Sequence, residues 1–216
     1  MLTVSRTAFD VLALILASAL CLHPAVVTAQ GRTQKISKKL VERAEDMVKD
    51  VGKTRAQVVK SVGKYNAVFQ GSKLKDRQKA YKSLLNEIKK TEEMVKQVRK
   101  DADTMQKEAD KFFNEWNKGL TKVTDNELRL LGFKNMTEGR ERYGKVVESG
   151  LKAGSLYGAF VTDLKNQCSY LELDMSDAAM TRLGPNREQT STRAATLYQS
   201  VDELTSATRG YIASMK

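Results

Sequence analysis

Histidine, cysteine, proline and aromatic residues are scarce in this sequence. Its 216 residues include one His, two Cys and two Pro, and 6% of them are aromatic. A single histidine excludes any catalytic or metal site that needs two, and the low aromatic content argues against a thick globular core. Charge, in contrast, is plentiful: 37 Lys and Arg against 26 Asp and Glu give a formal net charge of +11.

The first 29 residues have the pattern of a secretory signal peptide. Arg6 is the only basic residue before an apolar run from Val11 to Leu22, and Pro24 ends that run. Val27-Thr28-Ala29 then offers the small residues that a signal peptidase accepts, with cleavage before Gln30. We therefore expect an exported protein that is periplasmic or peripheral to the cell envelope.

Two other fates of this segment stay open. The apolar run has about twelve residues, whereas a helix needs ~20 to span the hydrocarbon of a bilayer. An uncleaved N-terminal anchor is therefore the second interpretation. Lipid attachment to Cys21 is the third, although a lipoprotein signal prefers a small residue before the cysteine and Leu20 stands there.

Cleavage would leave residues 30–216, which contain no histidine and hold Cys168 and Pro185 as the lone residues of their types. A lone cysteine cannot form an internal disulfide, and we expect Cys168 to be a small buried residue of a helix. Nucleophilic systems that pair Ser or Cys with His are excluded. Phosphate loops of the forms GxxxxGKS, GxxxxGKT and GxGxxG are absent from the sequence. We therefore expect no enzyme, no metal site, no cofactor and no small-molecule substrate.

The scarcity of proline and the spacing of apolar residues favour helices. Proline breaks helix interiors, and apolar positions here recur every three or four residues over two long segments, with charged residues between them. Such a narrow apolar stripe is typical of a coiled coil. The first stripe comprises Val41, Ala44, Val48, Val51, Arg55, Val58, Val62, Tyr65 and Phe69, and the second comprises Leu84, Ile88, Thr91, Val95, Val98, Ala102, Met105, Ala109, Phe112 and Trp116.

Gly71-Ser72 separates the two stripes and marks a turn. Residues 30–123 are therefore predicted to form an antiparallel coiled-coil hairpin, in which a helix from Asp76 to Leu120 would be roughly 65 Å long. Residues 124–216 are predicted to form a charge-neutral helical segment that packs on the hairpin. The expected fold is all-α: an elongated antiparallel coiled-coil hairpin that continues into a helical bundle of about four helices.

The second half of the sequence is predicted to hold three helical pieces. We expect a kink or loop near residues 132–135, a third helix from Thr137 to Leu173, a helical turn from Ala178 to Leu183, and a last helix from Arg187 to Met215. Pro185 stands where the start of a helix tolerates it. The apolar stripe predicted for the third helix comprises Tyr143, Val147, Gly150, Gly154, Tyr157, Val161, Leu164, Cys168 and Leu171.

Two features of these helices suggest contacts. Gly150, Gly154 and Gly158 give the third helix a face without side chains, at ~1 kcal/mol of helix propensity for each glycine. Close packing inside the bundle would offset that cost, and an oligomer contact or lipid insertion are the alternatives. Phe112 and Trp116 share one face of the second helix, where we expect an aromatic core layer, with a partner-docking patch as the alternative.

The excess of positive charge is confined to the predicted hairpin. Residues 30–123 contain 24 Lys and Arg against 13 Asp and Glu, a net charge of +11, whereas residues 124–216 contain 12 of each kind. A basic surface of this kind attracts polyanions, and the alternative is a solvated surface that aids solubility. The basic residues at the hairpin turn, our candidates for binding an anionic surface, are Lys73, Lys75, Arg77, Lys79 and Lys82.

Several stretches, taken in order, resemble a bacterial family catalogued as domain of unknown function 2959. They are Leu40-Val41-Glu42-Arg43-Ala44-Glu45, Phe113-Asn114-Glu115-Trp116, Glu138 with Arg142-Tyr143, Asp163 with Cys168 and Tyr170-Leu171, and Asp174 to Leu183. The Glu-Trp element is the most distinctive of them. The resemblance covers nearly the whole predicted mature chain. It implies an exported helical protein, often with lipoprotein-like features, and it carries over no functional residues.

Charge and the export signal together suggest a non-enzymatic protein that associates through its basic hairpin with an anionic envelope surface. The candidate partners are an anionic lipid, lipopolysaccharide or a cell-wall polymer. Nucleic acid is not expected, because an exported protein rarely meets it. The alternative is a structural or scaffold protein that self-associates as a homo-oligomer through its long apolar stripe and glycine strip.

Overall fold

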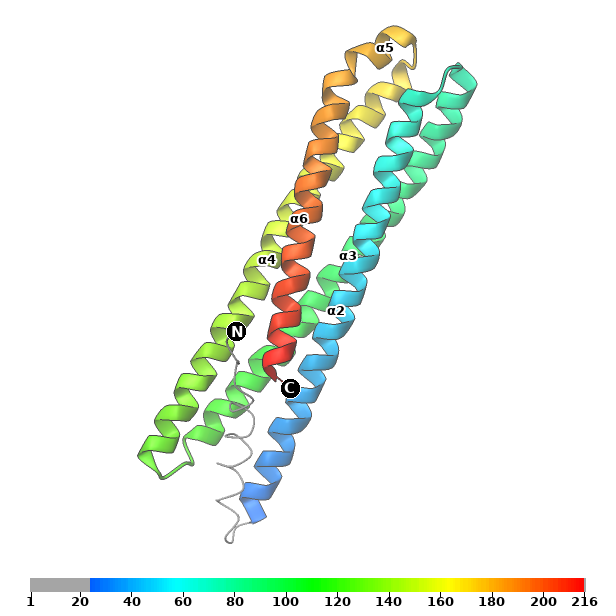
Figure 1. Cartoon of the computed structure of the whole chain (residues 1–216). Helices are drawn as coiled ribbons and strands as arrows, with labels where there is room; N and C mark the ends of the chain where they lie inside the picture. The colour runs from blue at the N-terminus through cyan, green and yellow to red at the C-terminus, as the bar shows by residue number, and fades with distance from the viewer. Residues whose placement is uncertain (1–23, 216) are drawn as a thin grey trace. The chain divides into compact units, whose positions relative to one another are not determined.

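The computed structural model describes residues 24–215, and these residues are helical almost throughout (Figure 1). Five α-helices and no strand occur within this part of the chain. The helices are α2 (Pro24–Gln70), α3 (Leu74–Leu120), α4 (Asn126–Leu173), α5 (Asp177–Arg182) and α6 (Gly184–Met215). The prediction of an all-α helical bundle is confirmed.

The predicted signal peptide lies mostly outside the described residues. Residues 1–23 are not described, and α2 begins at Pro24, inside the predicted signal segment. In residues 24–215 we find no helix with both the length and the apolar character needed to cross a membrane.

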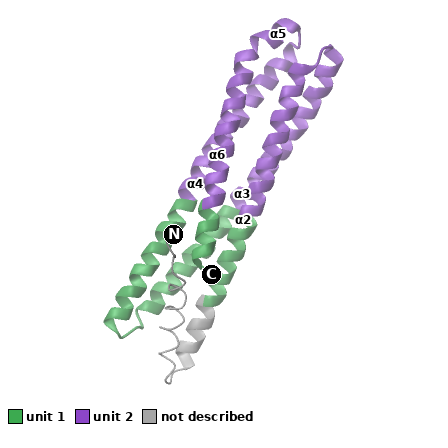
Figure 2. Ribbon diagram, in the orientation of Figure 1, with its two compact units in different colours: residues 1–47, 101–146, 207–216 green, residues 48–100, 147–206 purple. Residues whose placement is uncertain are grey.

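The chain forms two compact units, each of which takes segments from α2, α3, α4 and α6 (Figure 2). Unit 1 contains the part of α2 that ends at Met47, residues 101–146, and the end of α6 from Ala207. Unit 2 contains residues 48–100 and 147–206. The sequence boundary drawn at residue 123 rests on charge rather than on packing, and it stays a prediction.

Most of the core of unit 2 lies on the predicted stripes, although Val68 and Phe160 are buried outside them and the predicted Val62 and Phe69 are only partly buried. The turn that joins α2 to α3 falls at Gly71-Ser72, where the sequence predicts it. Because apolar residues recur at three-four spacing, each helix turns one apolar face inward. The fully or almost fully buried members of this core include Val58, Tyr65, Val68, Leu84, Phe160, Leu164, Leu171 and Leu197.

The core of unit 1 contains the aromatic layer that the sequence predicts. Phe112 and Phe113 are both 5% exposed. The rings of Phe112 and Trp116 meet edge to face with centroids 5.4 Å apart, and Tyr143 lies 5.5 Å from Tyr211 of α6. Phe112 is therefore a core residue of this unit, while Trp116 is partly exposed.

The predicted break near residues 132–135 is wrong, because α4 runs without interruption from Asn126 to Leu173. Gly132 has a packing role instead. A Cβ atom at this position would lie 2.2 Å from Cδ2 of Leu120, at the end of α3. At Gly139 a Cβ atom would lie 3.4 Å from Phe113, which is an ordinary van der Waals distance. Gly132 therefore lets α4 approach α3 closely, and neither glycine interrupts the helix.

The apolar stripe predicted for α4 is correct at Tyr143, which is 8% exposed, but wrong between Tyr143 and Tyr157. Val147 is 38% exposed, whereas Val146 and Ala153 are 4% and 6% exposed. Gly150 and Gly154, two further members of the predicted stripe, are only partly buried. From Tyr157 onward every member of the predicted stripe is buried, and Phe160 and Gln167, which the prediction does not include, are buried as well.

Candidate functional site

The charge of unit 2 is divided unevenly between its two helical pairs. Residues 48–100, which form its α2–α3 hairpin, contain 15 Lys and Arg and 5 Asp and Glu, a net charge of +10. Residues 147–206, from α4 to α6, contain 5 basic and 8 acidic residues, a net charge of −3. Residues 101–123 of the predicted basic hairpin carry 4 basic and 5 acidic residues. The basic surface is therefore a feature of residues 48–100, and we call these residues the basic hairpin of unit 2.

Four of the five basic residues predicted at the hairpin turn are available to a partner. The side chains of Lys73, Lys75, Lys79 and Lys82 are exposed. Lys73 is the residue before α3, and Lys75, Lys79 and Lys82 lie among the first nine residues of α3. We call these four residues the turn lysines.

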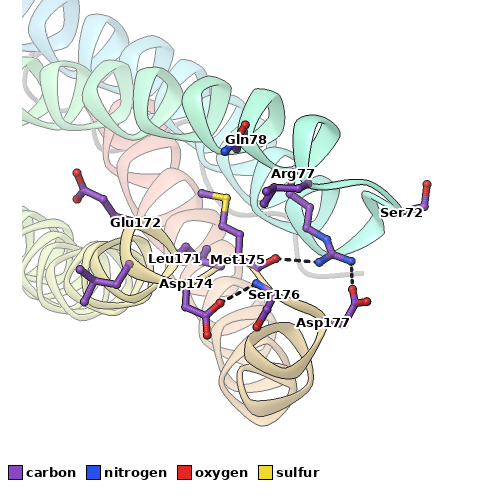
Figure 3. Close-up of a pocket in the computed structure, with 11 residues that line it drawn as sticks. Ser72, Arg77, Gln78, Leu171, Glu172, Asp174, Met175, Ser176 and Asp177 are labelled. Carbon is purple, nitrogen blue, oxygen red and sulfur yellow. Dashed lines mark hydrogen bonds and ion pairs between the residues drawn. The ribbon is translucent and has the colours of Figure 1, made fainter.

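The fifth predicted residue, Arg77, is not available, and its assignment to the binding surface needs correction. It is 8% exposed, and it donates hydrogen bonds from Nε to the carbonyl of Gly71 at 2.7 Å and from Nη1 to the carbonyl of Met175 at 2.8 Å. Its Nη2 also donates to the carboxylate of Asp177. Arg77 therefore holds the α2–α3 turn to the segment that follows α4 (Figure 3).

Gly71 is required for this arrangement. A Cβ atom at residue 71 would lie 2.8 Å from Cγ and 3.0 Å from the backbone nitrogen of Arg77. A contact this short with a backbone atom cannot be relieved by a rotamer change. The tight turn that the sequence predicts at Gly71 is thus coupled to the burial of Arg77.

An open cleft of about 600 Å³ lies beside Arg77 at this end of unit 2 (Figure 3). One wall comes from the start of α3, with Leu74 and Gln78, and the other from residues 171–177. Leu74 is 55% exposed and Leu173 is 87% exposed, and both line the cleft. Apolar side chains are therefore presented to solvent at this cleft, where Lys73 and Lys75 flank Leu74 in the sequence and Glu172 and Asp174 flank Leu173.

Two of the three acidic residues of the cleft, Asp174 and Asp177, have local roles, and the third, Glu172, is exposed. Asp174 accepts a hydrogen bond from the backbone N–H of Ser176 at 2.8 Å, and this bond holds the pKa of its carboxyl below the ordinary value. Ser176 caps α5 by accepting from the N–H of Ala179. Asp177 pairs with Arg77, although its own side chain is 91% exposed. These contacts fix the loop between α4 and α5.

A buried polar chain links three helices in the core of unit 2, and the sequence patterns did not reveal it. Tyr65 of α2 donates its hydroxyl hydrogen to Oε1 of Gln167 in α4, and Nε2 of Gln167 donates to Oγ1 of Thr190 in α6 at 2.7 Å. Gln167 is 6% exposed and Thr190 is 1% exposed. Their polarity fixes the mutual register of the three helices, since a slip would leave buried polar groups unpaired.

The described residues hold no candidate metal site, and their one cysteine is buried. No cluster of three or more His, Cys, Asp or Glu side chains that could hold a metal ion occurs within residues 24–215. Cys168 is a free, buried thiol, and burial raises its pKa to about 12. A thiol with a raised pKa is a poor nucleophile at neutral pH.

The glycine strip has only one close neighbour. A Cβ atom at Gly150 would lie 3.8 Å from Leu204, whereas the same atom at Gly154 or Gly158 would meet nothing within 4 Å. Leu151, on the same part of α4, is 72% exposed. Close helix packing therefore does not explain Gly154 and Gly158.

A comparison with protein families shows to which family the chain belongs. Residues 31–215 match the family described as "Protein of unknown function (DUF2959)". The chain is a member of the DUF2959 family. This confirms the resemblance seen in the sequence, and the match extends over almost all of the described part of this DUF2959 protein. Among curated proteins and among solved structures, none matches it.

Proposed function

We propose that this DUF2959 protein is an exported, non-enzymatic helical protein that binds an anionic surface of the cell envelope through the basic hairpin of unit 2. The observation that carries the proposal is the division of charge in unit 2, where the hairpin has a net charge of +10 and the facing segments have −3. A field this lopsided orients the protein toward a polyanion.

Two further observations support this proposal. The four turn lysines are exposed, so their ammonium groups are free to approach headgroup phosphates or acidic sugars. The family match begins at residue 31, immediately after the predicted signal-peptide cleavage before Gln30. Export would place the basic hairpin where anionic lipid, lipopolysaccharide and cell-wall polymer are the abundant polyanions.

Co-sedimentation tests the proposal. The full chain is mixed with vesicles of equal parts phosphatidylglycerol and phosphatidylcholine, with vesicles of phosphatidylcholine alone, and with purified cell wall, each at low and at raised salt. We expect binding to the anionic materials that weakens as salt screens the lysines, and little binding to neutral vesicles. Failure of the full chain to bind any of the anionic materials at low salt would refute the proposal.

Self-association is the second candidate, and the open face of α4 favours it. Gly154 and Gly158 face open space, and Leu151 and Val147 nearby are 72% and 38% exposed. A helix of a second copy could approach such a face closely. Light scattering over a range of concentrations tests this candidate, and a strict monomer at every concentration refutes it.

A further inference from the structure

We infer that a second copy of this chain docks on the cleft end of unit 2, and that the two copies form a symmetric dimer there. In this dimer the basic wall of each cleft faces the acidic wall of the other. The inference goes beyond the proposed function, because it concerns a partner of the cleft and not the anionic surface. Its basis is the opposite charge of the two walls, each of which presents an exposed leucine.

The two walls of the cleft carry charge of opposite sign. Residues 72–82, at the start of α3, contain five basic residues and one acidic residue, a net charge of +4. Residues 171–177, from the end of α4 to the first residue of α5, contain three acidic residues and no basic one, a net charge of −3. We call Lys73-Leu74-Lys75 the basic triplet and Glu172-Leu173-Asp174 the acidic triplet.

Both triplets are open to a partner. All six of their side chains are exposed, and the two leucines are 55% and 87% exposed. Within residues 24–215, neither Lys73, Lys75 nor Glu172 forms an ion pair. Asp177, in contrast, already pairs with Arg77. The charges of the two triplets are therefore left for a partner.

A second copy fits this surface better than a partner of one charge sign. An acidic partner would attract the basic triplet and repel the acidic one, and a basic partner would do the reverse. A second copy that is related by a two-fold axis offers both signs, because in such a contact each patch meets its counterpart on the other molecule. Each basic triplet then faces an acidic triplet, and four leucines are covered by one contact.

Arg77 fixes the spacing that this double contact requires. It ties Gly71 in the α2–α3 turn to Met175 and Asp177 on the other wall (Figure 3). Asp174 of the acidic triplet also accepts from the backbone N–H of Ser176 at 2.8 Å. The segments that carry the triplets are thus held in place before binding, which lowers the entropy cost of docking.

The contact is small, so the dimer should be weak and its strength should depend on salt. Stable protein interfaces bury about 1,200 Å² or more, which is more than two triplets from each copy provide. Pairs between exposed charges weaken as salt screens them. Lys79, Lys82 and the other exposed lysines of the basic hairpin lie outside the triplets, so the dimer leaves them for the proposed anionic surface.

Charge reversal with rescue is the test, and it is read by sedimentation velocity of the full chain at low salt, from about 1 μM to about 1 mM. Lys73→Glu/Lys75→Glu makes both triplets acidic. Glu172→Lys/Asp174→Asn makes both basic, and the asparagine keeps an acceptor for the N–H of Ser176. We expect the parent to dimerise and each variant alone to have a dimer dissociation constant about tenfold higher or more. An equimolar mixture of the two variants should restore association.

Two controls separate this interface from a general effect of charge and from the open face of α4. Lys35→Glu/Lys38→Glu changes the same charge at exposed residues of unit 1, and Leu151→Glu alters the exposed α4 residue. Both controls should dimerise like the parent.

The inference is overturned by a parent that stays monomeric up to about 1 mM, by reversed variants that dimerise like the parent, or by a mixture that does not restore association. Loss of the dimer in Leu151→Glu alone would assign the contact to α4 and overturn it as well. These measurements contain no anionic material, so their outcome is separate from that of the proposed function.

Discussion

The guanidinium group of Arg77 donates a hydrogen bond to the carboxylate of Asp177, 100 residues further along the chain. The two side chains differ sharply in exposure, 10% for Arg77 and 91% for Asp177. The arginine is therefore the buried member of the pair. Its other N–H groups donate to the carbonyls of Gly71 and Met175. We therefore infer that these carbonyl contacts of Arg77, rather than its ion pair with Asp177, stabilise the turn.

Replacement of Arg77 should destabilise unit 2. Arg77→Ala leaves two carbonyl groups without their donor, and we expect a loss of about 1–3 kcal/mol in the free energy of unfolding. Asp177→Asn should change little, because an exposed ion pair contributes little in water. Urea unfolding followed by circular dichroism measures both. Equal losses in the two variants would show that the ion pair, and not the carbonyl contacts, stabilises the turn.

The buried polar chain gives a matched pair of tyrosine variants. Tyr65→Phe removes the hydroxyl that donates to Gln167, so it leaves a buried amide oxygen without its donor and should cost about 1–2 kcal/mol. The hydroxyl of Tyr157 is buried and has no hydrogen-bond partner within the described residues. Tyr157→Phe should therefore be neutral or slightly stabilising. Equal losses of stability in Tyr65→Phe and Tyr157→Phe would contradict the stabilising role of the Tyr65 hydroxyl.

Glu108 should make the stability of unit 1 depend on acid pH. Its carboxylate is 7% exposed and accepts from Lys39 at 2.9 Å and from Lys111 at 3.1 Å. The hydrogen bond from Lys39 has the largest effect on the pKa of Glu108, and together with the bond from Lys111 it outweighs the opposing effect of burial, so the pKa lies below its ordinary value of 4.5. A carboxyl with a lowered folded pKa stabilises the fold above its unfolded pKa, and this contribution is lost as pH falls through the folded pKa.

The test is a series of unfolding measurements from neutral pH to below the ordinary pKa of 4.5. The parent should lose more stability than Glu108→Gln over this range, since the amide cannot titrate. Glu138→Gln is the control, because Glu138 pairs with Arg142 while 44% exposed. An identical pH dependence in parent and Glu108→Gln would contradict the assignment.

Glycines on α4 should respond to alanine with opposite signs. Gly132→Ala places a Cβ atom 2.2 Å from Leu120, and the buried leucine must shift, so we expect about 1 kcal/mol of destabilisation. Gly154→Ala meets nothing within 4 Å and should gain up to about 1 kcal/mol of helix propensity. Thermal unfolding of the two single variants decides this. A gain in stability of Gly132→Ala would mean that α4 does not need to approach Leu120 closely at this position.

These glycines also show where sequence reasoning stops. Apolar periodicity and Gly71-Ser72 predict the hairpin correctly, because both are local signals. The same reasoning predicts a break at Gly132, which the continuous α4 contradicts, and helix packing or an oligomer contact at Gly154, where a Cβ atom would meet nothing of this chain within 4 Å. Glycine lowers helix propensity at every position alike, and only the tertiary neighbour, Leu120 in one case and open space in the other, shows its role.

The candidate site was predictable to a similar extent. The clustering of basic residues at the turn is visible in the sequence, and four of the five are exposed as a binding surface requires. The burial of Arg77 is not visible, because its acceptors Met175 and Asp177 lie about 100 residues away. The link from Tyr65 to Gln167 spans a similar sequence separation, and no local pattern reports such contacts.

The most direct test of the central claim removes the turn lysines. The full chain with Lys73, Lys75, Lys79 and Lys82 changed to Gln is compared with a control that loses the same charge in unit 1, where Lys35, Lys38, Lys107 and Lys122 are exposed. Binding to phosphatidylglycerol–phosphatidylcholine vesicles is measured for both at low salt. The account predicts that the turn variant loses most of its vesicle binding and that the control keeps most of it. Equal losses would show that net charge alone drives binding, and an unchanged turn variant would contradict the account.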